Sequence, residues 1–406
     1  MTNYDIGIIG SGVAGSFAAL KLASEKNVKV AIIEIGRPPA KRRRQLEGFL
    51  GCLPNSDGKL YLSDIDKVSD LVTAKKTKSA LNYFNSKFDE INTFKIIKDK
   101  GPSISMVKKI KKLNFDIVLN DYKQIYTQDI HNLSRLISGD IESNKNIHCS
   151  FDNEILEGNP VKIHKTKGGF SVTTRTNEFK CKKLIIATGR SGWRWNYDLY
   201  KLFGIIDNND IAKFGGRIEI SSSYMKDFSK SNCSLIKDSF EVGPISWNGT
   251  IIPEDHLDLA ISAFRSNENR WKSDKVSFNL ILNANFENKG YEQTDRLGKL
   301  AFLLSNDRVV KERISTLIAG KSKLSIIPEY NKLIDPFKEM VSLIPELGTK
   351  GYFHFPTILP LPPKVALGNN LETEIEGLFL AGESAGITGI LSAALMGIVA
   401  ASSVLK

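Results

Sequence analysis

The most constraining feature of this sequence is a glycine-rich turn near its start, within the segment GIIGSGVAGSFAALKLA. Gly10, Gly12 and Gly15 follow an apolar run over residues 5–9 and open a segment, 14–24, whose apolar residues recur at helical spacing. In a strand–turn–helix of this kind, the first glycine permits the tight turn and the second lets the backbone approach a pyrophosphate. The third allows the helix to pack closely on the strand. The spacing therefore predicts a dinucleotide site at the start of the helix.

The residues around this turn support two further expectations. Val13 and Ala14 begin the helix, and their backbone N–H groups at its partly positive end are expected to bind the phosphates. A second apolar strand over residues 28–34 ends at Glu34, whose carboxylate is expected to accept hydrogen bonds from the adenosine ribose. Continuous apolar strands on either side of a helix are typical of a parallel sheet covered on both faces.

Two later segments distinguish a flavin dinucleotide from a nicotinamide one. LIIATG ends at Gly189, and GLFLAGESAG contains Gly382 and Glu383 and precedes a long apolar helix. Both match the later motifs of two-part FAD oxidoreductases, in which the acid, here Glu383, binds the ribityl hydroxyls. The backbone N–H groups expected at the start of the following helix belong to Gly386, Gly389 and Ile390. The predicted cofactor is therefore FAD, and this helix is expected to stabilise negative charge on its reduced ring.

A further segment, SDGKLYL at 56–62, follows an arginine run and a Gly–Cys pair. Together with GRSGWRW at 189–195 and the AGESAG ending, it resembles the uncharacterised FAD-dependent dehydrogenase family of the glutathione-reductase-like flavoproteins. The resemblance spans both ends of the chain and the middle strands. The residues that it implies lie beside the flavin are Ser56, Asp57, Gly58 and Lys59, with Lys59 stabilising the reduced ring. It also places Arg43 and Arg44 on the FAD phosphates or ribityl chain. A solvated turn and an exposed basic loop are the alternatives.

Four more residues are candidates for contact with a substrate or with the ring. His354 lies in GYFHFPTILPLPP, shortly before the terminal motif, and is a candidate catalytic residue together with Lys59. Arg190, Trp193 and Trp195 follow the third predicted strand and could stack on a ring or hold an anion. The alternatives are a buried histidine with satisfied hydrogen bonds and a packing cluster between domains.

The hydrophobic patterns predict a first domain that is discontinuous in sequence. Residues 1–60, 110–195 and 350–406 are expected to form an α/β, Rossmann-like FAD-binding domain with a parallel sheet. Residues 60–110 are expected to be a helical insertion. Residues 196–349 have short strands and loops rich in Ser and Asn, and they predict an inserted, mixed α+β substrate domain.

The composition excludes several classes of protein. With 41% hydrophobic and 25% charged residues, the chain is globular rather than disordered. Its four cysteines show no paired spacing and its five histidines no metal-ligand spacing, so neither a disulfide scaffold nor a metal site is expected. The uncharged stretch 386–405 is rich in Gly, Ala and Ser, which favours a buried helix over a membrane span. A cytoplasmic location is expected.

The function expected from these motifs is that of an FAD-dependent oxidoreductase. It would transfer hydride between a small organic substrate and flavin N5, with NAD(P)H left open as a transient reductant. The net charge of +11, from 56 Lys and Arg against 45 Asp and Glu, leaves an alternative, a flavin-dependent enzyme that modifies a nucleic acid or nucleotide. Lysine-rich stretches at 75–78 and 108–112 and the Arg–Trp cluster at 193–195 favour this alternative, although solvated surface charge also explains the balance.

Overall fold

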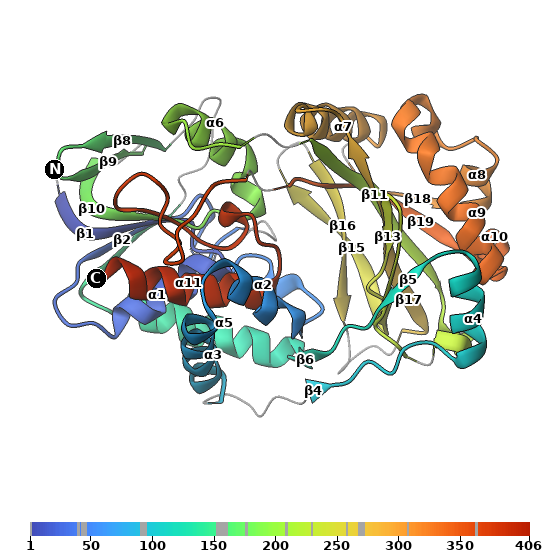
Figure 1. Ribbon diagram of the computed structural model, residues 1–406, viewed down its shortest axis with the longest axis horizontal. Coiled ribbons are helices and arrows are strands. Elements are labelled where there is room, and N and C mark those ends of the chain that lie inside the picture. The colour runs from blue at the N-terminus through green and yellow to red at the C-terminus, as the bar shows by residue number, and fades with distance from the viewer. Residues whose placement is uncertain are drawn as a thin grey trace.

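Two sheets, each with its own apolar core, organise the chain into two domains that lie side by side (Figure 1). The computed structural model describes residues 2–38, 41, 47–89, 96–151, 161–174, 178–207, 210–228, 230–256, 259–266, 273–306, 308–361 and 364–406. Both ends of the chain lie in the first domain, so the second domain is built from internal segments.

The sheet of the first domain has the strand order β7-β2-β1-β10, with β20 also paired to β10, and these strands run parallel. Their bounds are Thr2–Ile9 for β1, Val30–Ile33 for β2, Ile147–Ser150 for β7, Glu178–Ile186 for β10 and Leu378–Leu380 for β20. An antiparallel hairpin, β8 (Lys162–Thr166) and β9 (Gly169–Thr173), pairs with the first half of β10. This topology confirms the expected Rossmann-like α/β class. Because Ile9, Ile186 and Leu380 are in register, the carboxyl ends of three strands meet at one edge.

The glycine-rich turn and the C-terminal helix pack so closely that two positions require glycine. A Cβ on Gly15 would overlap the carbonyl oxygen of Gly10, and a Cβ on Gly397 would overlap that of Ala14. These contacts hold α1 (Val13–Ala23) against β1 and against α11 (Ile390–Val404). The other helices of this layer are α2 (Ser63–Leu71), α3 (Ala74–Asp89) and α5 (Thr127–Glu142). Among the described residues, no helix combines the length and apolar character that a membrane crossing needs.

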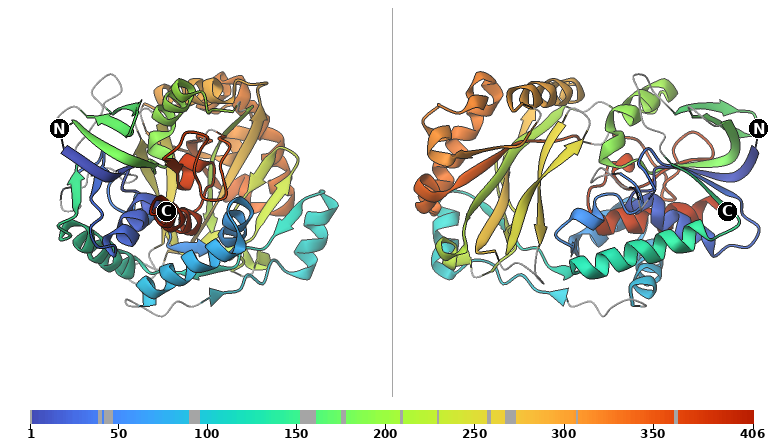
Figure 2. Two further views of the ribbon diagram at one scale, coloured as in Figure 1. Left: turned by 60° about the vertical axis from the view of Figure 1, so that its left-hand side comes forward. Right: turned by 180° about the vertical axis from the view of Figure 1, so that it is seen from behind.

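The sheet of the second domain has the order β18-β19-β11-β17-β13-β12-β5, with β14 paired to β17. Its strands are β5 (Asp116–Val118), β11 (Ile211–Ser221), β12 (Ser234–Lys237), β13 (Phe240–Val242), β14 (Ser246–Trp247), β17 (Lys275–Asn285), β18 (Val310–Arg313) and β19 (Tyr352–Leu359). A hairpin of β15 (Gly249–His256) and β16 (Leu259–Ser266) packs against β17 and β19 on the side of the first domain (Figure 2).

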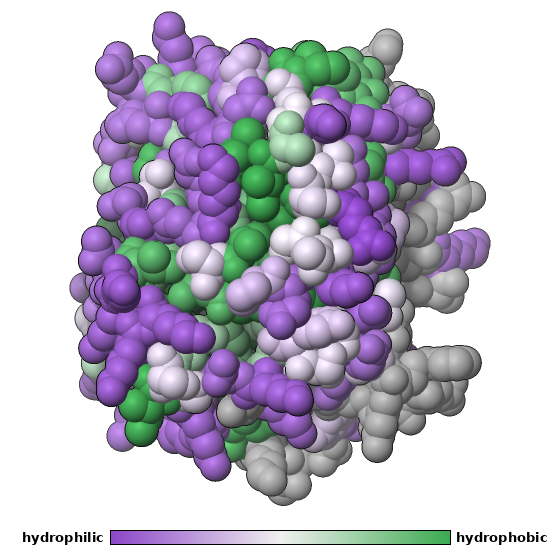
Figure 3. Space-filling view, turned by 90° about the vertical axis from the view of Figure 1, so that its right-hand side faces the viewer, coloured by the Kyte–Doolittle hydropathy of each residue, from purple (hydrophilic) through white to green (hydrophobic). Residues whose placement is uncertain are grey.

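The two faces of this sheet differ in chemistry because side chains alternate along each strand. Along β11, Ile218 and Ile220 enter an apolar core, whereas Arg217 and Glu219 point to the opposite face. Helices α4 (Ile104–Lys112), α8 (Ile314–Ile318), α9 (Ile334–Leu343) and α10 (Glu346–Lys350) contribute to that core at the outer end of the molecule. Seen from that end, hydrophilic residues predominate, with hydrophobic ones interspersed (Figure 3). Because these helices cover the apolar face of the sheet at the outer end, its polar face turns toward the first domain.

The domain boundaries differ from the sequence-based ones at two places. Helix α4 and strand β5, between residues 104 and 118, belong to the second domain, where Met106, Ile110 and Phe115 join its core. Strand β19 also pairs with β11 there, although it lies within the segment 350–406 that was assigned to the first domain. The remaining small sheet, β3-β6-β4, consists of β3 (Lys59–Tyr61), β4 (Ile96–Ile97) and β6 (Tyr122–Gln124) and connects the two domains. Sequence patterns missed these crossings because strand pairing joins residues that are far apart in the chain.

Candidate cofactor and substrate site

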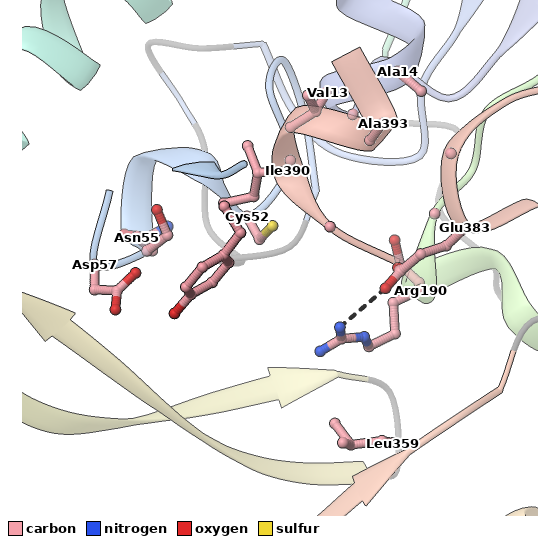
Figure 4. Close-up of a pocket in the computed structure, with 18 of the residues that line it drawn as sticks. Val13, Ala14, Cys52, Asn55, Asp57, Arg190, Leu359, Glu383, Ile390 and Ala393 are labelled. Atoms are coloured by element: carbon pink, nitrogen blue, oxygen red, sulfur yellow. Dashed lines mark hydrogen bonds and ion pairs between the residues drawn. The ribbon is translucent and has the colours of Figure 1, made fainter. Parts of the chain in front are cut away.

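A cavity of about 390 Å³ lies between the domains, where β1, β10 and β20 end. In open α/β sheets, ligands bind at the carboxyl ends of the strands, so its position is that of a ligand site. Many of the residues predicted from sequence to hold the cofactor line it: Gly12, Val13, Ala14, Ser56, Asp57, Gly189, Gly382, Glu383, Gly389 and Ile390. They come from five separate segments, and Figure 4 shows several of them facing the same space.

Gly12 is the glycine of the turn that protein packing does not explain. Gly10 has φ +93°, and a Cβ there would lie 2.6 Å from the carbonyl oxygen of Ala187, so its role is in the turn itself. Gly12 has φ −57°, and among the described residues beyond its two chain neighbours, only the Ala187 oxygen would lie within 4 Å of a Cβ there, at 3.9 Å. A side chain at Gly12 would instead enter the cavity. Helix α1 begins there with no side-chain cap and no acidic residue in its first turn, so its N-terminus suits an anion.

Two predicted site residues, Arg190 and Glu383, meet at the cavity wall. The guanidinium Nη2 of Arg190 lies 3.0 Å from Oε1 of Glu383, and both side chains retain some exposure to the cavity (Figure 4). The two segments that carry Arg190 and Glu383 are joined by buried hydrogen bonds, because Asn196 donates to the Ser384 hydroxyl at 3.3 Å and Tyr200 donates to the Ser384 carbonyl at 2.9 Å. Arg190 therefore orients Glu383, which differs from the role toward the substrate that its sequence position suggested.

Glu34 has a different role from the one predicted. Its Oε2 accepts hydrogen bonds from the N–H and the hydroxyl of Ser11, both at 2.7 Å. Its Oε1 accepts from the N–H groups of Gly36 and Gly48, at 2.8 and 3.0 Å. A carboxylate has about four acceptor positions, so these bonds use its capacity, and the side chain is 3% exposed. In this structure Glu34 fastens the glycine-rich turn to the loop after β2, and it does not face the cavity.

The start of α11 also differs from the sequence-based expectation of a positive helix end open to the flavin. Asp64 of α2 places Oδ2 against this end, 3.4 Å from the backbone nitrogen of Ser392. Burial raises the pKa of Asp64, while Lys67, at 2.8 Å, and the N–H groups of Ser392 and Leu391 oppose that increase. Gly389 and Ile390 still line the cavity, but the charge of the helix end is offset from behind by a carboxylate.

Lys59 lies outside the cavity, in a buried polar cluster between the domains. Its Nζ donates to Oδ1 of Asn232 at 2.6 Å and to the carbonyl of Ile245 at 3.2 Å, and it is 3.6 Å from Asp57. The Ser246 hydroxyl also belongs to this cluster and donates a hydrogen bond to Oδ2 of Asp57 at 3.2 Å. Lys59 therefore joins the two domains through the second domain's Asn232 and Ile245, which corrects its predicted place at the ring.

His354 is also absent from the cavity wall. It lies on β19 opposite Arg217, and its Nε2 is 3.6 Å from Oε2 of Glu219. The His354 imidazole and then Lys311, whose Nζ is 2.7 Å from Glu219, lower the pKa of Glu219 to about 2, while burial opposes them. This arrangement matches the alternative of a buried histidine only in part, because its Nε2 makes no hydrogen bond to any described residue.

Trp193 and Trp195 pack within the protein. Trp195 donates its indole N–H to the carbonyl of Val161 at 2.9 Å and belongs to the core of the first domain. Trp193 lies on α6 (Trp193–Phe203) and contacts Tyr291 of α7 (Gly290–Leu304), with ring centroids 4.9 Å apart. Arg194 completes this junction with an ion pair to Asp295 at 2.6 Å. The cluster is thus the packing contact between domains that was the alternative to a substrate site.

The other predicted residues are accounted for as follows. Gly58 has φ +70°, and a Cβ there would overlap the Ile125 carbonyl, so it is required by the turn. Gly386, with φ +84°, ends the short helix η8 (Gly382–Ala385), and it does not line the cavity. Arg43 and Arg44 lie outside the described residues. The described residues contain no group of three His, Cys, Asp or Glu that could hold a metal ion.

Sequence reasoning missed the wall that the second domain provides. Arg217 of β11 and Asn279 of β17 are directly opposite in register and line the cavity together with Thr357 and Leu359 of β19. Tyr61 lines it as well; burial raises its pKa well above the usual range, and the charge of Asp57 adds to this effect. Cys52, from the Gly–Cys pair before SDGKLYL, also reaches the cavity (Figure 4). Two segments gave a signal: SDGKLYL, which contains Tyr61, and GYFHFPTILPLPP, which contains Thr357 and Leu359.

Comparison with known proteins gives only distant structural similarity. No protein-family model and no curated protein sequence matches the chain. Similar solved structures include glycine oxidase from Geobacillus kaustophilus, with 12% identity, a TM-score of 0.46 and coverage of 100% of this chain and 95% of that one. A mutant of halogenase PltM in complex with FAD has 13% identity, a TM-score of 0.48 and coverage of 99% and 68%. At these values the similarity carries no weight for the reaction, and membership of the FAD-dependent dehydrogenase family stays a prediction.

Proposed function

We propose that this protein is an FAD-dependent oxidoreductase that transfers hydride between a small organic substrate and flavin N5. The observation that carries the proposal is the cavity at the carboxyl ends of β1, β10 and β20, toward which Gly12 presents no side chain. Glycine at that point has no packing reason within the described protein, whereas an approaching pyrophosphate gives it one. When bound, FAD supplies the hydride chemistry, and the protein supplies binding, orientation and the exclusion of water.

The residues of the first domain divide the binding of such a cofactor between them. The N–H groups of Val13 and Ala14, at the uncapped start of α1, would bind the pyrophosphate. Glu383, held by Arg190, would accept hydrogen bonds from the ribityl hydroxyls. Glu34 would act indirectly, by fixing Ser11 within the glycine-rich turn.

The second domain would form the substrate side of the cavity. Tyr61, Arg217 and Asn279 present hydrogen-bond donors there, and the register of β11 with β17 fixes the position of Arg217 relative to Asn279. Because burial keeps the Tyr61 hydroxyl protonated across the physiological pH range, it can donate a hydrogen bond or a proton to a substrate oxygen. The closed junction between α6 and α7 would limit the entry of water.

The structure offers no support for the alternative that the protein modifies a nucleic acid. The two lysine-rich stretches lie on α3 and α4, which belong to different domains. The Arg–Trp cluster at 193–195 is used in packing, as described above. The basic balance is explained by solvated lysines such as Lys108, Lys109, Lys111 and Lys112, which are exposed on α4.

The test is the absorption spectrum of the purified protein, before and after incubation with FAD and removal of the excess. We expect flavin bands that remain with the protein and bleach under anaerobic conditions when a suitable reductant is added. Addition of NADH and then NADPH determines whether a nicotinamide is that reductant; if neither bleaches the bands, reduced organic metabolites are screened next. Protein that neither carries FAD nor retains it after incubation would refute the proposal.

A further inference from the structure

Two helix N-termini border the cavity, and they differ in charge. Helix α1 begins at Gly12, with no acidic residue in its first turn. Helix α11 begins at Gly389 and also has no acidic residue of its own there, but Asp64 of the neighbouring helix α2 supplies one. A Cβ on Gly389 would overlap the Asp64 carboxylate, so the φ +130° glycine also makes room for it. The carboxylate therefore lies directly behind the part of α11 that faces the cavity.

Asp64 is buried and, among the described residues, has one cationic partner. The residue is 1% exposed, and its Oδ1 lies 2.8 Å from Nζ of Lys67, one turn further along α2. Its Oδ2 faces the backbone N–H groups at the start of α11. The Lys67 side chain is 46% exposed, so water screens its charge more than that of Asp64. The net effect at the cavity is that of a buried negative charge which is only partly compensated.

We propose that the Asp64–Lys67 pair sets the reduction potential of the FAD bound in this cavity, by fixing the charge at the start of α11. The inference rests on the proposed function. Asp64 is a positioning residue, because it does not line the cavity and acts through Gly389 and Ile390, which do. Two-electron reduction of FAD with uptake of one proton adds one negative charge to the ring. A buried carboxylate nearby opposes that added charge, so it makes the bound FAD harder to reduce.

The experiment compares the midpoint potential of bound FAD in the wild-type protein and in three variants, by anaerobic titration with dithionite and a reference dye. Asp64→Asn removes the buried charge but keeps an amide oxygen that can accept from α11. We expect the equilibrium constant for reduction to rise on the order of tenfold, because a buried charge that opposes the charge on the reduced ring is removed. For a two-electron couple this corresponds to about +30 mV.

Two further variants separate charge from structure. Lys67→Gln removes the compensating cation, and we expect the potential to shift in the opposite direction, by less than the tenfold change because Lys67 is half-exposed. Asp66→Asn makes the same charge change as Asp64→Asn on the same helix, but Asp66 is exposed and points away from α11, so its effect is expected to be under twofold. The absorption spectrum of the reduced protein is recorded in each case as a second readout of the charge on the ring.

The inference is overturned if Asp64→Asn and Lys67→Gln shift the potential in the same direction, or if neither exceeds the Asp66→Asn control. If Asp64→Asn does not fold, the sign of the Lys67→Gln shift decides alone. Wild-type protein that binds no FAD overturns the proposed function itself, whereas FAD that binds with an unchanged potential in all variants overturns this inference and leaves the proposed function standing.

Discussion

Gly12 provides the sharpest test of where the cofactor lies, because its replacement separates folding from binding. In Gly12→Ala the nearest described atom beyond the two neighbouring residues would be the Ala187 carbonyl oxygen, 3.9 Å from the new methyl group, and φ of −57° is open to alanine. Alanine is a poorer N-cap than glycine by up to about 1 kcal/mol, and it gains about 0.4–1 kcal/mol by restricting the unfolded chain. The free energy of unfolding of the apoprotein should therefore change by less than about 1 kcal/mol.

FAD binding should respond quite differently to the same methyl group. The methyl would occupy the space of the pyrophosphate and break at least two charge-assisted hydrogen bonds at the start of α1, each worth about 1.5–3 kcal/mol. The expected loss of affinity is about 10²–10⁴-fold. The assay combines urea unfolding of the apoprotein, which gives the stability, with quenching of FAD fluorescence on titration, which gives the dissociation constant.

Gly15→Ala is the matched control, since it adds the same methyl group three residues further along. There the Cβ would overlap the Gly10 carbonyl, so the apoprotein should lose about 1–3 kcal/mol of stability or more. A Gly12→Ala protein that binds FAD within threefold of the wild type would refute the placement of the pyrophosphate at this turn. So would a Gly12→Ala protein that loses stability as severely as Gly15→Ala.

Three further predictions follow from the contacts around the cavity. The pKa of Glu219 is lowered from 4.5 to about 2, so this residue should contribute about 3 kcal/mol to the free energy of unfolding above pH 4.5, and the contribution should be lost as the pH falls toward 2. In urea-unfolding measurements, Glu219→Gln should make the stability less dependent on pH in this range, and an unchanged pH dependence would contradict the prediction. Lys59→Met should lower the free energy of unfolding by about 1–3 kcal/mol, because hydrogen bonds of Lys59 to Asn232 and Ile245 are lost. The folded variant should keep the wild-type rate of flavin reduction in stopped-flow measurements, and unchanged stability with slower reduction would instead support a catalytic role for Lys59. Arg190→Met should change the free energy of unfolding by under about 1 kcal/mol, since the ion pair with Glu383 is partly exposed. It should nevertheless weaken FAD binding more than tenfold in a fluorescence titration, and an affinity equal to that of the wild type would show that the pair has no part in binding.

Much of the first domain was determined by local sequence. The apolar runs that became β1, β2 and β10, and the spacing of Gly10, Gly12 and Gly15, depend on residues that are neighbours in the chain. Strand and helix periodicity, turn glycines and helix starts are short-range properties, so they can be read without knowledge of the partners. The same holds for the GLFLAGESAG segment, which became β20, η8 and the start of α11.

The assignment of individual side chains was less complete, because a motif gives the position of a residue and not its partners. Glu34 and Lys59 occupy the predicted places in the chain, but protein partners that are distant in sequence bind both side chains. Glu34 accepts a hydrogen bond from the N–H of Gly48, and Lys59 donates one to Oδ1 of Asn232. Trp195 was a candidate for stacking on a ring, but in the structure its indole N–H donates to the carbonyl of Val161. In each case a group that can bind a ligand can equally well be satisfied by the protein.

The sequence by itself thus determined the Rossmann-like framework, and it predicted the edge of the sheet at which a ligand can bind and the glycine at which a pyrophosphate can approach. Only the tertiary structure decided what faces that edge. The pairing of Arg217 with Asn279 depends on the register between β11 and β17, and the carboxylate of Asp64 reaches α11 across the packing of two helices. Register and helix packing are set by the burial of whole apolar faces, a property of the complete fold that no short segment carries.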